Sequence, residues 1–176
     1  MEAEIDRMNK IISAIFVSVV LLLPVAAQSA RLTANDLKPL LGKQWIGDLT
    51  YRDYKTGEPT PIKSNVSISR SMTEPLAWIF DIRYPQEPKA DRKEVVKLSD
   101  DGRVFDGETV VERTKLAGGI LRIVTTKPGE DDNRPATFRH TYMIGKKSFS
   151  IRKEVRFNRT EQYFERNIYE WTRYRR

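Results

Sequence analysis

Residues 77–84 read Ala-Trp-Ile-Phe-Asp-Ile-Arg-Tyr, and this stretch decides the fold class. Its large apolar residues fall on alternate positions: Trp78, Phe80, Ile82 and Tyr84. In an extended strand such residues share one face, whereas a helix would spread them around its axis. The stretch ends before Pro85, which has no backbone N–H to donate to a sheet. The pattern therefore predicts a β-strand that buries one face.

The same period of two recurs along the rest of the chain, with turn residues between the periodic stretches. The sequence Ser-Asp-Asp-Gly at 99–102 is a hairpin signal, and residues 127–135 are expected to form a polar loop. The expected strands cover residues 45–51, 66–70, 77–84, 95–98, 104–105, 109–115, 120–126, 137–144, 149–157 and 162–174. So many sequential strands with tight turns predict an all-β fold, an antiparallel up-and-down β-barrel of about 8–10 strands. A β-sandwich is the alternative.

A short helix is expected before the first strand, over residues 33–42. Thr33 can cap it, and Asp36 lies three residues later, in the favourable first turn. Three leucines share one face of this helix: Leu37, Leu40 and Leu41. The apolar face predicts that the helix is a lid or plug.

Residues 1–27 have the three-part build of a secretory signal peptide. Basic residues precede the apolar run 11–23, and small residues follow it up to Ala27. Cleavage there would leave one domain, residues 28–176, and predicts a periplasmic or secreted protein. A retained membrane anchor is the alternative, but the run is shorter than the ~20 residues that a spanning helix needs.

The composition limits the possible chemistry. The chain has no cysteine, which excludes disulfides, thiolate metal sites and a cysteine nucleophile. Its formal net charge is +7, and residues 28–176 alone hold 29 basic and 21 acidic residues, a net charge of +8. This excess favours anionic partners, including an anionic lipid surface, although interspersed charge also serves solubility. The C-terminal strand mixes aromatic and basic residues, but no nucleic-acid partner is expected for an exported protein, and a monomer is expected.

A family resemblance enters at residues 41–54, Leu-Gly-Lys-Gln-Trp-Ile-Gly-Asp-Leu-Thr-Tyr-Arg-Asp-Tyr. This segment resembles the opening of the calycins, the lipocalins and fatty-acid-binding proteins, and the chain is similar to uncharacterised bacterial secreted proteins with such an opening. The spacing here is Gly-x-x-Trp, where lipocalins have Gly-x-Trp. In that family a basic residue of the final strand packs on the tryptophan, which would place Arg173, or else Arg166, over Trp45. The resemblance implies a barrel with a ligand cavity.

The single histidine, His140, shares a strand face with Phe138, Tyr142 and Ile144 and is expected to point inward. Metal sites normally need more than one such ligand, and the chain has neither a Gly-x-Ser-x-Gly motif nor a metalloprotease helix. We therefore expect no enzymatic activity, no catalytic residue, no metal and no cofactor. A hydrogen-bonded interior histidine is the simplest interpretation of His140.

Two basic residues fall on apolar strand faces. Arg122 lies between Ile120 and Val124, and Lys153 lies between Ile151 and Val155. An isolated charge in a dry core costs several kcal/mol, so each needs a counter-charge, a wet cavity or a solvent-facing strand face. The resemblance to fatty-acid-binding proteins implies that Arg122, Lys153 and Tyr142 would hold an anionic head group.

The resulting hypothesis is an exported binding protein for a small apolar or amphiphilic ligand, including an anionic one, held inside the barrel. The alternative is an interaction or scaffold protein of the cell envelope, with a basic outer face and no internal ligand. The expected ligand-binding residues are Tyr51, Trp78, Phe80, Arg122, Phe138, His140, Tyr142 and Lys153.

Overall fold

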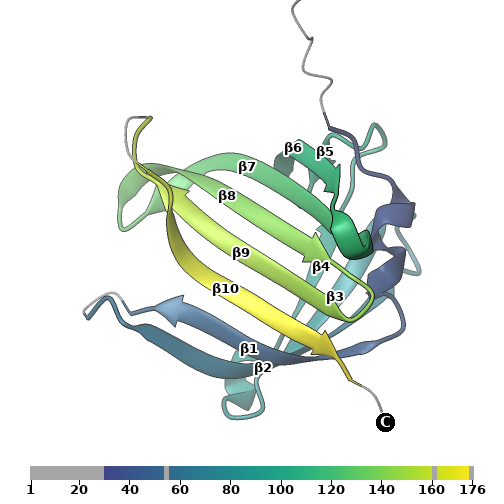
Figure 1. Cartoon of the computed structure of the whole chain (residues 1–176), viewed down its shortest axis with the longest axis horizontal. Helices are drawn as coiled ribbons and strands as arrows, with labels where there is room; N and C mark the ends of the chain where they lie inside the picture. The colour runs from purple at the N-terminus through teal and green to yellow at the C-terminus, as the bar shows by residue number, and fades with distance from the viewer. Residues whose placement is uncertain (1–29, 54–55, 160–161, 175–176) are drawn as a thin grey trace, which may run out of the picture.

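The computed structural model describes residues 30–53, 56–159 and 162–174 (Figure 1). The predicted signal peptide, residues 1–27, therefore lies outside the described residues. The described residues form ten strands: β1 (Gln44–Arg52), β2 (Pro59–Arg70), β3 (Ala77–Arg83), β4 (Arg92–Lys97), β5 (Val104–Phe105), β6 (Glu108–Lys115), β7 (Leu121–Asp131), β8 (Arg134–Ile144), β9 (Ser148–Arg156) and β10 (Phe164–Arg173). Three short 3-10 helices accompany them: η1 (Ala34–Leu40), η2 (Pro88–Ala90) and η3 (Ala117–Gly119).

The strands form one antiparallel sheet in the order β4-β3-β2-β1-β10-β9-β8-β7-β6-β5. Strands that are consecutive in the chain pair with each other, except β4 and β5, which are the two edges of the sheet. β1 also pairs with β10, so the sheet curls into a nearly closed up-and-down barrel (Figure 1). The remaining gap is bridged by one isolated pair, Leu98 with Phe105. We call this side of the barrel, between β4 and β6, the seam. The predicted fold class is confirmed.

The β7–β8 hairpin is longer than the sequence pattern predicts. The expected polar loop at 127–135 is wrong, because β7 runs on to Asp131 and β8 starts at Arg134. The connecting residues Asp132 and Asn133 have φ values of 52° and 55°. Two consecutive left-handed residues give the turn whose twist matches that of the flanking strands. Aspartate and asparagine tolerate this conformation better than other non-glycine residues, so two residues are enough for the turn.

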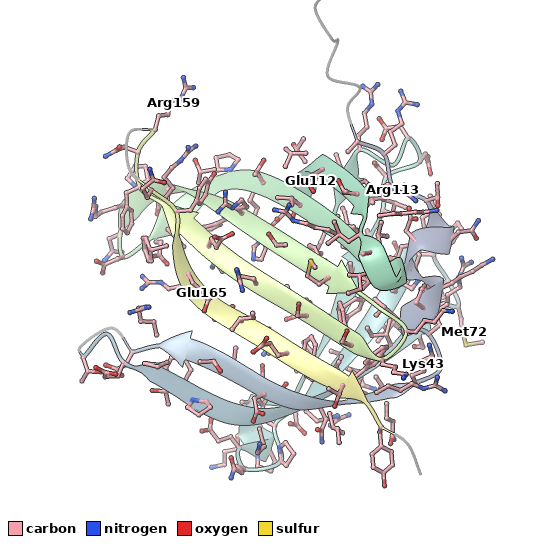
Figure 2. All side chains as sticks on the ribbon, in the orientation of Figure 1. Lys43, Met72, Glu112, Arg113, Arg159 and Glu165 are labelled. Atoms are coloured by element: carbon pink, nitrogen blue, oxygen red, sulfur yellow. The ribbon has the colours of Figure 1, made fainter. Side chains whose placement is uncertain are left out.

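The N-terminal helix η1 closes one end of the barrel, which we call the plug end. Leu37 and Leu40 of η1 are buried in the core, so the predicted plug is confirmed. Asp36 accepts a hydrogen bond from the backbone N–H of Thr33 (2.8 Å) and caps the helix. It also accepts two hydrogen bonds from Arg113 of β6, at 2.6 and 3.0 Å, which fasten η1 to the barrel wall (Figure 2).

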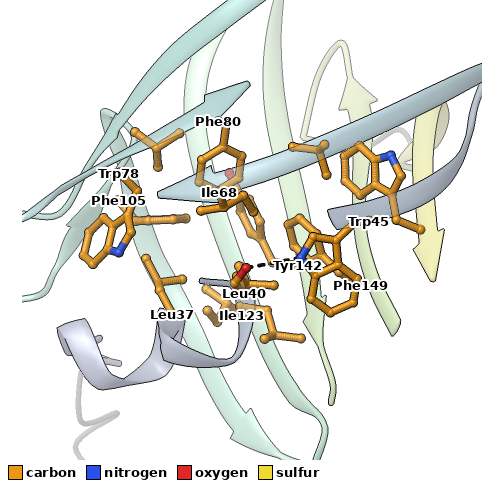
Figure 3. Close-up of a cluster of buried hydrophobic side chains, with 14 of the residues drawn as sticks. Leu37, Leu40, Trp45, Ile68, Trp78, Phe80, Phe105, Ile123, Tyr142 and Phe149 are labelled. Carbon is orange, nitrogen blue, oxygen red and sulfur yellow. Dashed lines mark hydrogen bonds between the residues drawn. The ribbon is translucent and has the colours of Figure 1, made fainter. Parts of the chain in front are cut away.

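Aromatic side chains fill the barrel interior next to the plug (Figure 3). Phe149 stacks on Trp171, with ring centroids 5.1 Å apart, and meets Trp45 edge to face at 6.0 Å. The Trp45 indole N–H donates to the Leu40 carbonyl at 3.2 Å and so ties the core to η1. Buried aromatic and aliphatic side chains thus fill the part of the interior next to η1.

The cation over Trp45 is not the predicted one. Lys43 lies there, with its ammonium 5.8 Å from the ring centroid. Arg166 lies seven residues from Arg173 along β10, roughly 23 Å at the rise of an extended strand, and pairs with Asp131 instead. Arg173 is opposite Trp45 in the β1–β10 register but stays exposed at the end of its strand.

Candidate functional site

A cavity of about 210 Å³ lies inside the barrel, beyond the aromatic core. Its lining comes from β3, β4, β8, β9 and β10 and from the turn after β5: Phe80, Ile82, Arg92, Glu94, Val96, Asp106, His140, Tyr142, Ile151, Lys153, Asn167, Tyr169 and Trp171. Because β4 and the turn after β5 flank the seam, the cavity reaches the seam. The wall thus combines aromatic rings with charged and amide groups.

One row of polar residues crosses the inner wall. The strand register places Thr125 opposite His140, His140 opposite Lys153, and Lys153 opposite Asn167. We call these four residues the polar row. His140 and Thr125 point into the barrel. Tyr142 and Ile123, each two positions away on the same strand and therefore on the same face, are buried in the core. The row separates this core from a smaller apolar cluster of Ala136, Phe138 and Val155.

Glu108 of β6 holds one end of the polar row in place. Its side chain is 2% exposed, and it accepts hydrogen bonds from Thr125 Oγ1 (2.6 Å) and Lys127 Nζ (3.0 Å). The His140 Nδ1 lies 2.8 Å from the same carboxylate. Burial disfavours the Glu108 charge, but His140, Thr125 and Lys127 outweigh it, so its pKa falls below the ordinary value. The carboxylate therefore stays ionised and fixes the orientation of the imidazole.

Lys153 is a cation without an acidic partner among the described residues. Its Nζ lies 4.2 Å from the centroid of the Phe138 ring, and the side chain lines the cavity. A cation over an aromatic face gains only part of what it loses on leaving water. The ammonium therefore remains open to an anionic group in the cavity.

Two tyrosines and an arginine form the rim of the cavity near β4. Arg92 donates to the hydroxyls of Tyr84 and Tyr169 and pairs with Glu94. The two phenol oxygens lie 2.7 Å apart. Burial and the hydrogen bond to Tyr169 raise the pKa of Tyr84 well above its usual range, so the Tyr84 phenol stays a neutral hydrogen-bonding group. Asp106 is the other acid at the rim, and its pKa is raised by desolvation and by the charges of Glu108 and Glu94.

The structure brings together four of the residues expected to bind a ligand. Phe80, His140, Tyr142 and Lys153 all line the cavity. Trp78 and Phe138 lie inside the barrel but in its packed apolar clusters. Tyr51 is half-buried and stands opposite Asn167 in the β1–β10 register, next to the polar row, without lining the cavity.

Arg122 lies on the outer face, contrary to the sequence expectation. Its neighbours Leu121 and Ile123 are in the core, so strand alternation turns Arg122 outward, where it pairs with Glu112 at 3.3 Å. Val124 shares this outer face and is still buried. Apolar residues therefore occupy both faces of β7, so the period of two in the sequence does not show which face points into the barrel.

Several residues of the site were missed by sequence reasoning. Arg92, Asn167 and Tyr169 line the cavity, and Glu108 lies behind it in contact with His140. Glu108 meets His140 from 32 positions away in the chain. The alternation in each strand marks which residues share a face, but it does not give the register between strands. Only the pairing of β6 to β7 and of β7 to β8 places Glu108 beside His140.

Comparison of the chain with models of known protein families finds no match, and comparison with curated proteins finds none either. The antiparallel ten-stranded barrel is consistent with a calycin-like fold. Within the described part of the chain, no helix has both the length and the apolar character needed to cross a membrane.

Proposed function

We propose that this chain is an exported, calycin-type binding protein that holds a small amphiphilic molecule with one anionic group in the cavity. The observation that carries the proposal is Lys153, a cation without an ionic partner among the described residues, in the wall of an internal cavity. An anionic group on the ligand would supply the missing counter-charge. The proposed role is binding without chemical turnover.

The cavity volume limits the size of the ligand. Its 210 Å³ corresponds to roughly seven water molecules at about 30 Å³ each. Typical small-molecule pockets are larger, about 300–1,000 Å³. The proposed ligand is therefore compact, such as an arene carboxylate or a short-chain acid, and a long-chain fatty acid would not fit wholly inside.

The lining supports an amphiphile rather than a purely apolar molecule. Phe80, Tyr142 and Trp171 offer ring surface to an apolar body, and Lys153 and Asn167 offer N–H donors to its anionic group. Glu108 is hydrogen-bonded to the Nδ1 of His140. The other ring nitrogen, Nε2, has no hydrogen-bond partner among the described residues. Glu108 thus presents the imidazole at a fixed angle to a bound ligand.

Native mass spectrometry and titration calorimetry would test this proposal. Protein purified from its own compartment without detergent should carry a small co-purifying mass. In calorimetry, benzoate and octanoate should bind at least about tenfold more tightly than benzamide and octanamide, because a charge-assisted contact adds 1.4 kcal/mol or more. Fluorescence of Trp171, which lines the cavity, should report the same binding.

Two lysine variants make the test specific. K153M removes the ammonium but keeps the stem, and should abolish the preference for the acid over the amide. K63M is the matched control, since Lys63 is an exposed lysine that pairs with Asp48 on the surface, and it should leave the preference intact. No co-purifying mass together with no binding of any probe, or an unchanged preference in K153M, would refute the proposal.

The rival functions lead to different measurements. A scaffold protein with no internal ligand would show an empty cavity and no response of Trp171 to any probe. An enzyme would convert a bound compound and lose that conversion in H140A. A binding protein would return its ligand unchanged in both the parent chain and H140A.

A further inference from the structure

Six basic side chains surround the plug end of the barrel: Lys38, Lys43, Lys115, Lys146, Lys147 and Arg173. All except Lys43, which is half-buried, are exposed. They come from η1, the residue before β1, the end of β6, the β8–β9 turn and the end of β10. We call this group the basic end. Figure 2 shows Lys43 on this side and Arg159 at the opposite end of the molecule.

Backbone contacts join these residues into one arc. The Arg173 N–H donates to the Lys147 carbonyl at 2.9 Å, and the Lys43 ammonium donates to the Pro39 carbonyl of η1 at 2.7 Å. Leu121 of β7 pairs with Lys115 of β6 on one side and with Ile144, the last residue of β8, on the other. Lys115 therefore lies two strands from the start of the β8–β9 turn. Partial burial and the charge of Arg173 lower the pKa of Lys43, in keeping with their proximity.

The basic end is not neutralised by acidic residues. None of its six side chains has an ion pair among the described residues, and Asp36, the acid of η1, is buried and paired with Arg113. The outer wall of the barrel differs, because Arg122, Arg139 and Arg152 pair there with Glu112, Glu154 and Glu165. Six cations without ion pairs among the described residues therefore lie together at the plug end.

Apolar side chains project beside these charges. Leu116, next to Lys115, is 37% exposed, and Tyr174, next to Arg173, is 46% exposed. Met72, in the β2–β3 turn at the same end, is fully exposed. Basic residues interleaved with protruding apolar and aromatic residues are the composition that binds the interface of an anionic bilayer. An acidic protein or polysaccharide would have no need of the apolar tips.

We propose that the basic end docks on the surface of an anionic phospholipid bilayer. The lysines and Arg173 meet the lipid head groups, and Leu116, Tyr174 and Met72 reach into the boundary between head groups and acyl chains. The polar row then lies away from the bilayer, on the far side of the aromatic core. This inference does not depend on the cavity or its ligand.

Vesicle flotation would test the docking. The protein should float with phosphatidylcholine vesicles that contain phosphatidylglycerol at about 50 mM salt, and should not float with pure phosphatidylcholine or at about 500 mM salt. K146Q/K147Q should weaken binding about tenfold or more, since each basic residue near the surface contributes to the attraction. L116S should also weaken binding at about 50 mM salt, because it removes an apolar side chain from the boundary between head groups and acyl chains.

The matched control is K89Q/R159Q, which removes two exposed cations from the opposite end of the barrel. It should bind vesicles like the parent chain. Equal weakening in both double variants would show a general charge effect and overturn the proposal. Absence of flotation at low salt would also overturn it, as would binding to soluble heparin without binding to the vesicles. Circular dichroism melts should show that all variants fold.

Discussion

Glu108 is the residue on which the polar interior depends. A buried carboxylate is stable only when donors surround it, and Glu108 has three: Thr125, Lys127 and His140. The barrel interior therefore contains a fixed negative charge next to the imidazole of His140, which lines the cavity. This arrangement leads to two expectations at the residue scale.

The first concerns stability. E108Q keeps the shape of the side chain but removes the charge that three donors share, and should lower the free energy of unfolding by about 1–3 kcal/mol. E112Q is the control, because the Glu112–Arg122 pair is partly exposed and should contribute no more than about 1 kcal/mol. Urea unfolding followed by tryptophan fluorescence would measure both. A loss in E112Q as large as that in E108Q would contradict the assignment.

The second concerns pH. Since the pKa of Glu108 is lowered in the folded state from its ordinary value of 4.5, its ionisation stabilises the fold above that value. The stabilisation should disappear as the pH falls through the folded-state pKa. The difference in unfolding free energy between the parent chain and E108Q should therefore shrink from about pH 6 to about pH 3. Parallel stability curves across this range would show that Glu108 does not titrate in this way.

At the scale of the elements, the β7–β8 hairpin depends on its two-residue turn. Asn133 has a φ of 55°, where a side chain with a β-carbon is strained and glycine is not. N133A should lower the free energy of unfolding by about 1 kcal/mol, and N133G should match or exceed the parent chain. Thermal melts of the two variants would decide. Equal melting temperatures for N133A and N133G would contradict the left-handed turn.

The same hairpin shows why sequence reasoning succeeds for strands and fails at their ends. Alternating apolar residues identify Ala77–Arg83 and most other strands, and the leucines of η1 identify the plug. Residues 127–134 at the tip of β7–β8 are mostly charged and include Pro128 and Gly129, so no apolar period marks this part of the strands. The two-residue turn at Asp132 and Asn133 determines where these two strands end.

The candidate site was only partly predictable for a related reason. Lys153 and His140 stand on faces with clear alternation, so their inward orientation can be read from the sequence. Arg122 stands on a strand that buries residues on both faces, and the burial of Leu121 and Ile123 in the core turns it outward, toward Glu112. Residues of the site such as Glu108 and Asn167 come together only through long-range register, which a single sequence does not contain.

For the whole molecule, the seam is the weakest line of the barrel. Every other junction is a ladder of paired residues, whereas the described parts of β4 and β5 meet in one bridge, Leu98 with Phe105. Strand edges without partners open at lower free energy than central strands. The seam should therefore open before the rest of the barrel.

Hydrogen exchange would measure this opening. Amides of β4 and β5 should exchange faster than those of β8 and β9, which have partners on both sides. Addition of a cavity ligand such as benzoate should slow exchange at β4, because Arg92 and Glu94 line the cavity. Uniform exchange across all strands would indicate that the barrel is closed equally on every side.

The pairing of β1 with β10 also determines where the protein can be attached to a carrier or a sensor surface. Tyr174 is hydrogen-bonded to Gln44, and the described chain begins at Ala30, near Leu32, which donates to the Gly102 carbonyl, so both described ends lie at the plug end. A carrier protein or sensor chip joined at either described end, Ala30 or Tyr174, would therefore sit near η1. Solutes would still reach the opposite half of the barrel, which makes immobilisation through either end compatible with binding assays.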